Sequence, residues 1–494
     1  MKKTIILFLV AVTMAIPIGC ADWLNVTPRS EKESEDLFSS EDGYRTALAG
    51  VYMLMRQSNL YGYSTTMFIP EYMARNWSLP TNQQQTAYLL ANFRYGENSV
   101  KGLFFNTWRN YYKVIVQLND IIEHVENSAA VFEGNNRRIV EGEAVGLRAF
   151  LHLDLLRYYG PVPVDADLTQ KAIPYMDAVT FKADEALSIS YKEVLECIER
   201  DLLRAEELLV DVDPIVLYSN SVLNGNFSED EDIWLKRRQG RFNYYAVLAT
   251  QARLQLWKGD KVKATNYAKQ VVEATNAGTG RRFLLQNNFQ GGLLMSAEHI
   301  FHLHIPTLIK DVQGAYRGSS YLTTTFYQLT TIDANPNIMN NLYETAVNGN
   351  DIRYSATQFD RLWEREQGGN NYYFYLRKYL EESTPGYMSK NVVPLIRISE
   401  MYLILAEAAS TGEAAAYFTD IKKARNMDLT KPVTQVLRVD VEKEYRKEFI
   451  GEGQMFFFYK RHNYEEYPWP SRFILPVDGN PYVIPKPEEQ TSFE

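Results

Sequence analysis

Aromatic and hydrogen-bonding side chains gather in two stretches of the chain that lack helical periodicity. The first stretch runs from Asn59 to Tyr95, and the second lies within residues 316–372. Flat rings pack against the C–H faces of sugars, while amides and guanidinium groups bond to hydroxyls. The residue types therefore predict a carbohydrate site displayed on loops. The candidate ligand-binding residues are Trp77, Asn76, Tyr61, Tyr63, Arg75, Asn82 and Tyr88 in the first stretch and Tyr316, Tyr321, Trp363 and Tyr372 in the second.

Each of these rings has an alternative role in packing. Trp77, between Asn76 and Ser78, is the strongest single candidate for ligand contact. The alternative that Trp77 pins its loop to the core has equal weight, because large aromatic side chains serve both purposes. For any one residue of the second stretch, packing is the favoured interpretation.

Three histidines could begin a metal site. His302 and His304 would share one face of a strand, and His299 precedes them. No third ligand follows at a recognised spacing, and the sequence lacks HExxH. The pattern favours ordinary strand histidines, so we predict neither a metal nor a cofactor.

Catalytic motifs are also missing from the sequence. Cys197 is adjacent to a helical apolar stripe without a neighbouring base, which favours a small buried side chain over a nucleophile. The chain has no P-loop, GxSxG or GxGxxG motif. A pair of glycosidase carboxylates could still arise among 61 acidic residues. The sequence favours a binding protein over an enzyme.

Charge and the N-terminal residues indicate the compartment. The formal net charge of -9 disfavours a nucleic-acid partner. Lys2 and Lys3 precede an apolar stretch from Ile5 to Ile16, and Gly19-Cys20 follows. This order predicts a signal peptide over residues 1–19. It resembles a bacterial lipoprotein signal, which implies acylation of Cys20 and a membrane anchor.

The remaining chain, residues 20–494, is predicted to form one mostly α-helical domain. Helical periodicity covers residues 40–56, 104–127, 138–159 and 191–209. Residues 243–274 resemble a tetratricopeptide hairpin hinged at Gly259-Asp260, and Gly412-Glu413 marks a degenerate second one. From about residue 277 to residue 394 the pattern predicts a loop-rich insertion with a few short strands. Residues 394–461 are again predicted to be helical.

An ordered series of short motifs resembles the starch-binding SusD and RagB family of surface lipoproteins from Bacteroidetes. The early motifs are DWLNVTP, LFSSEDGYRTALAGVY, WRNYYKVIVQLN and EGEAVGLRAFLHLDLLRYYGPVP. The later ones are ARLQLWKGD, DIRY, RKY, VPLIRISEMYLILAEA, YRKEFIGEGQMFFFYKR and YVIPKPEEQ. Where the family pattern ends GEGxR, this chain reads GEGQ at residues 451–454.

The resemblance implies a helical frame with tetratricopeptide-like hairpins and an irregular ligand-binding side. It also implies an outer-membrane, cell-surface location and a SusC-like TonB-dependent transporter over which the lipoprotein sits as a lid. We therefore expect capture of a nutrient, most simply an oligosaccharide, for delivery to that transporter. A peptide-binding RagB-type receptor, an exported glycoside hydrolase and a periplasmic tetratricopeptide scaffold remain alternatives.

Overall fold

The computed structural model describes most of the chain after residue 34. It covers residues 35–494 with gaps at 81, 127, 181, 226–231, 278–279, 290–291, 309–311, 313–328, 332–336, 355–361, 369–370, 380–390, 477–479 and 493. The predicted signal peptide, Cys20, Tyr316 and Tyr321 lie outside the described residues.

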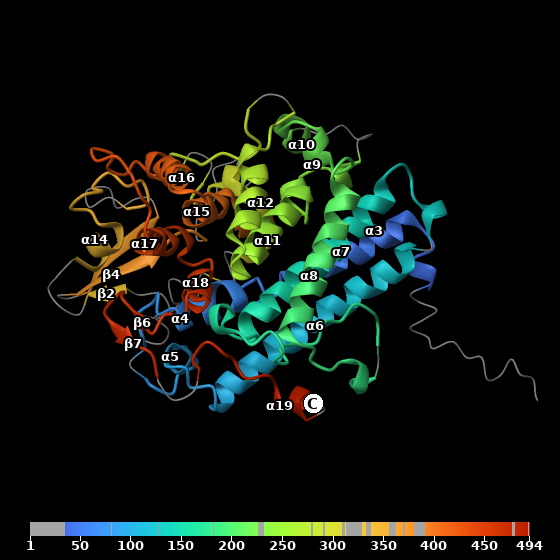
Figure 1. The fold of residues 1–494 in the computed structure, drawn as a ribbon, viewed down its shortest axis with the longest axis horizontal. Helices are drawn as coiled ribbons and strands as arrows, with labels where there is room; N and C mark the ends of the chain where they lie inside the picture. Colours follow the sequence, from blue (N-terminus) through green and yellow to red (C-terminus); the bar gives the residue numbers. More distant parts are fainter. Residues whose placement is uncertain are drawn as a thin grey trace, which may run out of the picture.

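The described chain is mostly α-helical, which confirms the predicted fold class (Figure 1). The helices of the first half are α3 (Glu41–Met55), α4 (Ile69–Met73), α5 (Thr86–Ala91), α6 (Asn98–Glu126), α7 (Asn136–Tyr159), α8 (Tyr191–Leu209), α9 (Pro214–Leu217) and α10 (Asn220–Asn224). Those of the second half are α11 (Tyr244–Trp257), α12 (Lys261–Glu273), α14 (Asn337–Tyr343), α15 (Ile398–Ala408), α16 (Thr411–Ala424), α17 (Arg438–Phe449), α18 (Met455–Arg461) and α19 (Glu488–Thr491).

Helix α7 is the central element of the helical frame. Its residues are buried without interruption from Ile139 to Tyr159, and α6 and α8 pack along it. Close approach to α8 needs glycine, since a Cβ at Gly142 would lie 2.6 Å from a carbon of Leu209. A helix buried all round has no polar face, so its charged side chains must be paired; Arg148 accordingly donates to Asp201 of α8 at 2.6 Å.

The predicted tetratricopeptide-like hairpin is formed by α11 and α12. Gly259 has a φ of +78°, and the Asp260 carboxylate caps α12 by accepting from the Lys263 backbone N–H at 3.0 Å. The second hairpin, α15 and α16, also forms. Its turn lies at Ala409–Ser410 and not at Gly412-Glu413, because Gly412 is already in the first turn of α16.

Residues 59–95 are more helical than the sequence predicts. A π-helical segment, Ser64–Phe68, is followed by α4, and α5 comes after a further loop. These helices have five or six residues, which is too short to show a 3.6-residue period in the sequence. The prediction of an irregular segment was therefore wrong for these residues.

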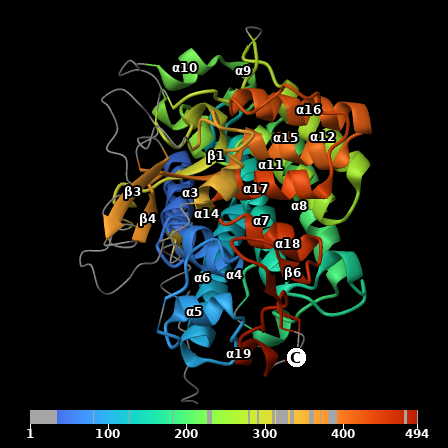
Figure 2. The ribbon, with the colours of Figure 1, turned by 90° about the vertical axis from the view of Figure 1, so that its left-hand side faces the viewer.

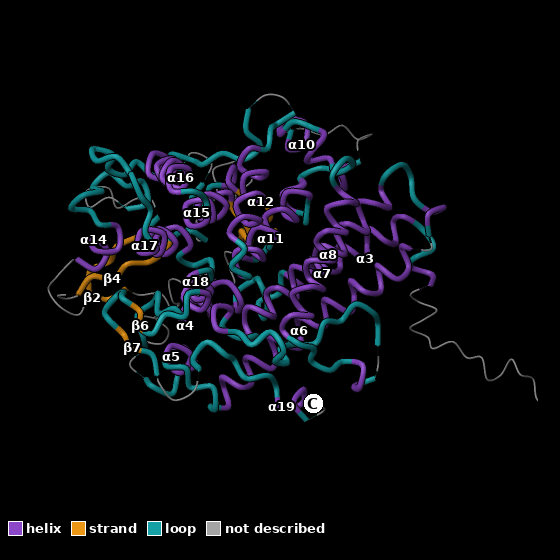
Figure 3. Tube along the Cα trace, in the orientation of Figure 1, coloured by secondary structure: helices purple, strands orange, loops and turns teal. Residues whose placement is uncertain are grey.

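In the described part of the chain the strands form three small antiparallel sheets. Most of these strands lie within or beside the predicted insertion (Figure 3). Strand β1 (His299–His304) pairs with β5 (Val392–Arg397). The order of the second sheet is β2 (Leu329–Thr331), β4 (Asn371–Leu376), β3 (Trp363–Gly368). Strands β6 (Glu466–Tyr467) and β7 (Phe473–Ile474) form a short hairpin.

The charged residues of the motifs DIRY, VPLIRISE and YRKEFIGEG meet in a buried ionic network. Its centre is Glu448 of α17, whose carboxylate accepts from Arg353 at 3.0 Å, from Arg397 at 2.7 Å and from Arg425 at 2.7 Å. The three guanidinium groups hold the pKa of Glu448 well below its usual range despite burial. These motif residues therefore join the insertion to the helical frame.

The network extends toward α4 through the GEG turn at residues 451–453. The Glu452 carboxylate accepts from Arg397 at 2.9 Å and from Lys378 at 2.6 Å. The next residue, Gly453, has a φ of +73°, and a Cβ there would lie 2.5 Å from the carbonyl oxygen of Thr66. Only glycine fits this contact between the turn and the π-helical segment. At the following position, Gln454 accepts from Arg157 at 2.9 Å.

Candidate functional site

The two ring-rich stretches of the sequence meet in the structure at two tryptophans. The rings of Trp77 and Trp363 have centroids 6.3 Å apart. Both side chains are buried, with exposed fractions of 1% and 3%, and the Trp363 indole N–H donates to the Tyr343 hydroxyl at 2.9 Å. Asn76 is buried to the same extent as Trp77. In this conformation the three side chains are packed in the interior, and none of them lines an accessible surface.

Two further residues of the first stretch serve structural contacts. The Tyr61 hydroxyl donates to Asp154 at 2.7 Å inside the core. The Arg75 guanidinium donates to the Ala91 carbonyl at 2.9 Å and lies 3.6 Å from the centroid of the Phe473 ring. The Arg75 contacts fix the C-terminal end of α5 and strand β7 relative to the end of α4.

Three other candidates retain accessible surface. Tyr63 is half-buried and stacks on Phe68, with centroids 5.5 Å apart and planes inclined by 21°. Asn82 is exposed and accepts from the Gln84 backbone N–H at 3.0 Å, while Tyr88 is half-buried. Tyr372 belongs to β4, but its side chain lies outside what the structure describes.

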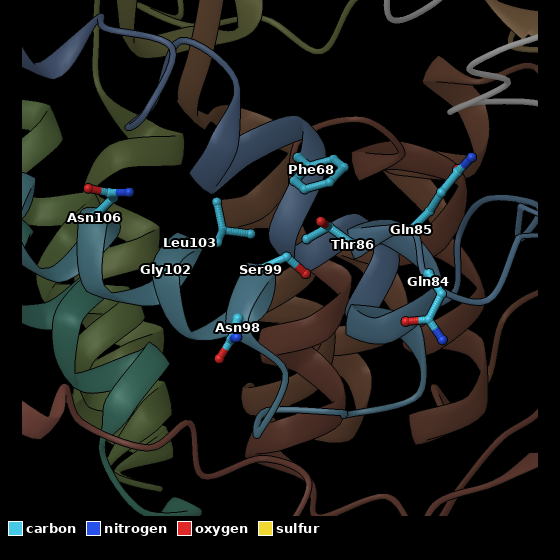
Figure 4. A pocket seen from close by; sticks show the side chains of 9 residues that line it. All are labelled: Phe68, Gln84, Gln85, Thr86, Asn98, Ser99, Gly102, Leu103 and Asn106. Atoms are coloured by element: carbon cyan, nitrogen blue, oxygen red, sulfur yellow. The ribbon is translucent and has the colours of Figure 1, made fainter.

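An open groove lies beside this stacked pair, between the start of α5 and the first turns of α6 (Figure 4). Its volume of about 720 Å³ is within the range usual for ligand sites, roughly 300 to 1,000 Å³. In Figure 2, α4, α5 and α6 lie together in the lower half of the molecule. The lining residues are Phe68, Gln84, Gln85, Thr86, Asn98, Ser99, Gly102, Leu103 and Asn106.

The chemistry of the groove comes from neutral side chains. Four amides and two hydroxyls line it, together with the apolar side chains of Phe68 and Leu103, and none of the nine residues is ionisable. Asn98, Gly102 and Asn106 follow one another at intervals of four residues, so they share one face of α6. A Cβ at Gly102 would meet nothing within 4 Å, which leaves the floor of the groove open.

The sequence predicts only one side of the groove. The stretch from Asn59 to Tyr95 contains Phe68 and Gln84–Thr86, but the groove residues of α6 lie outside it. The exposed amides of Asn98 and Asn106, opposite the apolar face of that helix, are the signal that could have indicated them.

A buried carboxyl group lies in α4, three residues after Phe68 of the groove. The Glu71 carboxylate accepts from the Asn76 amide at 3.0 Å and from the Gly453 backbone N–H at 2.8 Å. Burial raises the pKa of Glu71 to about 7, and the bonds from Asn76 and the glycine turn oppose this shift only in part.

The strand histidines bond to each other and to the backbone. The His299 Nε2–H donates to the Leu294 carbonyl at 2.8 Å, so Nδ1 of His299 is left to accept from Nδ1–H of His302 at 3.2 Å. Burial lowers the pKa of His299 to about 3. Among the described residues, no group of three His, Cys, Asp or Glu side chains could hold a metal ion.

Comparison with known proteins assigns the family. The profile described as "Starch-binding associating with outer membrane" matches residues 22–221, and the profile "SusD family" matches residues 317–474. The chain belongs to the SusD family. No helix in the described part of this SusD family member is long and apolar enough to span a membrane.

Curated SusD-like proteins are similar to part of this chain, and solved structures share its fold. SusD-like protein P38 from Formosa agariphila is 26% identical over 43% of this chain and 38% of its own length. The chain thus spans well under half of that relative. A SusD superfamily protein from Bacteroides thetaiotaomicron has a TM-score of 0.68 at 19% identity, covering 92% of this chain and 98% of that one.

One of the similar solved structures is named for the glycan that it binds. A laminarin-binding SusD-like protein has a TM-score of 0.61 at 16% identity, covering 92% of this chain and 98% of its own. At this identity the likeness concerns the fold. The SusD family member described here therefore has the fold of carbohydrate-binding SusD proteins.

Proposed function

We propose that this SusD family member captures an uncharged oligosaccharide in the groove between α5 and α6. The observation that carries the proposal is the lining itself, in which amides and hydroxyls surround two apolar side chains without any ionisable group. Amides pair with sugar hydroxyls, and the Tyr63–Phe68 stack offers an aromatic edge beside them. The starch-binding description of the family and the laminarin-binding neighbour agree with this chemistry.

The proposal includes a location and a partner. We infer that Cys20 is acylated, that the protein is anchored to the outer surface of the outer membrane, and that a SusC-like TonB-dependent transporter receives the ligand. The family description as associating with the outer membrane supports this arrangement. A Cys20→Ala variant is expected in the soluble fraction when it is produced without the transporter. Membrane retention of that variant would contradict the anchor, and a fractionated wild type is the control.

Removal of two groove amides tests the site. An Asn98→Ala, Asn106→Ala double variant is expected to bind laminarin or starch oligosaccharides roughly tenfold more weakly, because each lost hydrogen bond contributes about 0.5–1.5 kcal/mol. Both side chains are exposed, so the melting temperature should stay near that of the wild type. Isothermal titration calorimetry measures the affinity.

The matched control for this variant is Gln83→Ala. Gln83 is an exposed amide in the loop before α5, next to Gln84, and it does not line the groove. Unchanged affinity in the double variant, or an equal loss in the control, would move the binding site away from this groove.

A further inference from the structure

A small cavity lies inside the helical frame, where α7, α11, α15, α17 and α18 come together (Figure 1). Its volume is about 30 Å³. A water molecule needs about 10–15 Å³ of such volume, so the cavity is too small for a sugar and accommodates about two waters or one larger ion. The polar residues that line it include Arg157, Arg253, Arg461, Glu400, Tyr445 and Gln454.

Arg157 of α7 lines this cavity and carries a donor that the described residues do not satisfy. Its Nη1 donates to Asp154 at 3.0 Å, and its Nη2 donates to Gln454 at 2.9 Å. Its Nε is buried and has no hydrogen-bond partner among the described residues. The residue is only 4% exposed, so bulk water does not reach this N–H. Because a buried N–H without an acceptor is costly, we expect an occupant of the cavity to accept from it.

Other residues of the cavity follow the same pattern. Arg253 donates to Glu400 at 2.7 Å through both Nε and Nη2, which leaves its Nη1 without a partner in the described part of the chain. Arg461 uses its two Nη atoms for Glu407, which leaves its Nε. The hydroxyl of Tyr445, a residue that is 6% exposed, makes no hydrogen bond to any described residue. Each of the three guanidinium groups at the cavity thus keeps one N–H for an acceptor.

The acceptors around the cavity are already engaged. Both carboxylate oxygens of Glu400 accept from Arg253, and the side-chain oxygen of Gln454 accepts from Arg157. A water molecule would bring two hydrogens of its own, whereas an anion brings only lone pairs. Guanidinium groups also bond more strongly to an ionised acceptor than to a neutral one. The pattern of hydrogen bonds therefore favours an anion over water.

The charges around the cavity leave a place for one negative charge. Each of the three arginines is paired with one carboxylate, the pairs being Arg157–Asp154, Arg253–Glu400 and Arg461–Glu407. Lys460 of α18, when protonated, is a fourth cation, and its ammonium group donates only to the carbonyls of Tyr158 and Gly160. It has no carboxylate partner among the described residues. One monovalent anion would balance this cation, whereas a divalent anion would exceed it.

We propose that this cavity binds a small monovalent anion, chloride in an extracellular medium, which fastens α7 and α11 to α17 and α18. The cavity shares no residue with the groove between α5 and α6, so the inference does not depend on the proposed function. Because the anion binds only the folded chain, the stability of the protein should rise with chloride concentration.

The first test is the melting temperature of the wild type in sodium chloride, with sodium gluconate holding the ionic strength constant. Gluconate is far too large for the cavity. With a dissociation constant of about 10 mM, raising chloride from about 1 mM to about 300 mM should raise the melting temperature by roughly 2–4 °C. Sodium bromide should have a similar effect. A melting temperature that is the same in chloride and in gluconate would overturn the inference.

Two variants separate binding in the cavity from a general salt effect. Gln454→Glu places a carboxylate beside Arg157 with almost no change in shape, so its melting temperature should no longer depend on chloride. Tyr445→Phe removes one donor and should shift the chloride dependence to roughly threefold or more higher concentration. The matched control is Tyr402→Phe on α15, which alters a half-buried phenol outside the cavity and should behave like the wild type. Wild-type chloride dependence in Tyr445→Phe, or in a folded Gln454→Glu, would refute the site.

Crystals of the wild type grown in sodium bromide give the direct test. An anomalous peak should lie in the cavity, within hydrogen-bonding distance of the Arg157 Nε. Water in the cavity without an anomalous peak would contradict the inference. A bromide peak in a protein whose melting temperature ignores chloride would mean binding at crystal concentration only, which would contradict it as well.

Discussion

Glu448→Gln is expected to lower the free energy of unfolding by about 3–5 kcal/mol at pH 7, the usual cost of removing one partner from a buried ion pair. The substitution preserves the volume of the side chain and removes its charge. Arg353, Arg397 and Arg425 would then lose their shared carboxylate in a site where all four side chains are almost completely buried. Denaturant unfolding followed by circular dichroism measures the loss.

An exposed ion pair supplies the control for this variant. Glu196 lies 3.6 Å from Lys192 on the surface of α8, and Glu196→Gln should change the stability by less than about 0.5 kcal/mol. The depressed pKa of Glu448 adds a pH signature, because its stabilisation is present above the ordinary pKa of glutamate and is lost as pH falls toward the folded value. Wild-type stability in Glu448→Gln would show that the network does not join the insertion to the frame.

Trp77→Ala is the second variant with a large expected effect, and we expect it to act on stability. Replacing a buried tryptophan by alanine costs about 3–5 kcal/mol. Trp77 is 1% exposed and packs against Trp363. Its replacement by alanine would therefore leave a cavity where the two ring-rich stretches meet. Differential scanning calorimetry should show a markedly lower melting temperature, and Trp77→Phe should recover part of it.

The opposite outcome for Trp77 would also be informative. If Trp77→Ala melted like the wild type and lost glycan binding, the indole would contact the ligand directly, in a conformation other than the one described. The sequence alone weighs these two roles equally because the residue type suits both.

The helical frame follows from local signals in the sequence. The turn at Gly259-Asp260 combines a residue that tolerates positive φ with a residue that caps a helix, and both act as expected. Periodicity also predicts α7, although it does not show that α7 is buried on every side. The start of α6 at Asn98 was predicted six residues too late, because its first turns present exposed amides to the groove.

The ionic network and the groove depend on contacts that no local pattern reveals. Arg353 and Glu448 are 95 residues apart in sequence, and each belongs to a motif that looks like an ordinary polar segment. The groove joins the loop before α5 to one face of α6, so neither segment predicts it alone. The family resemblance indicates a stretch that contributes Phe68 and Gln84–Thr86 to the groove, but burial decides which of its residues pack and which remain accessible.

The most direct test of the account is a calorimetric titration of residues 21–494, free of lipid, with three classes of ligand at two salt concentrations. We expect binding without chemical conversion of an uncharged glucan oligosaccharide, with an affinity that changes little with salt, because the groove has no ionisable lining to be screened. Preference for a sulfated or uronic-acid glycan or for a peptide, or release of reducing sugar during the titration, would contradict the account.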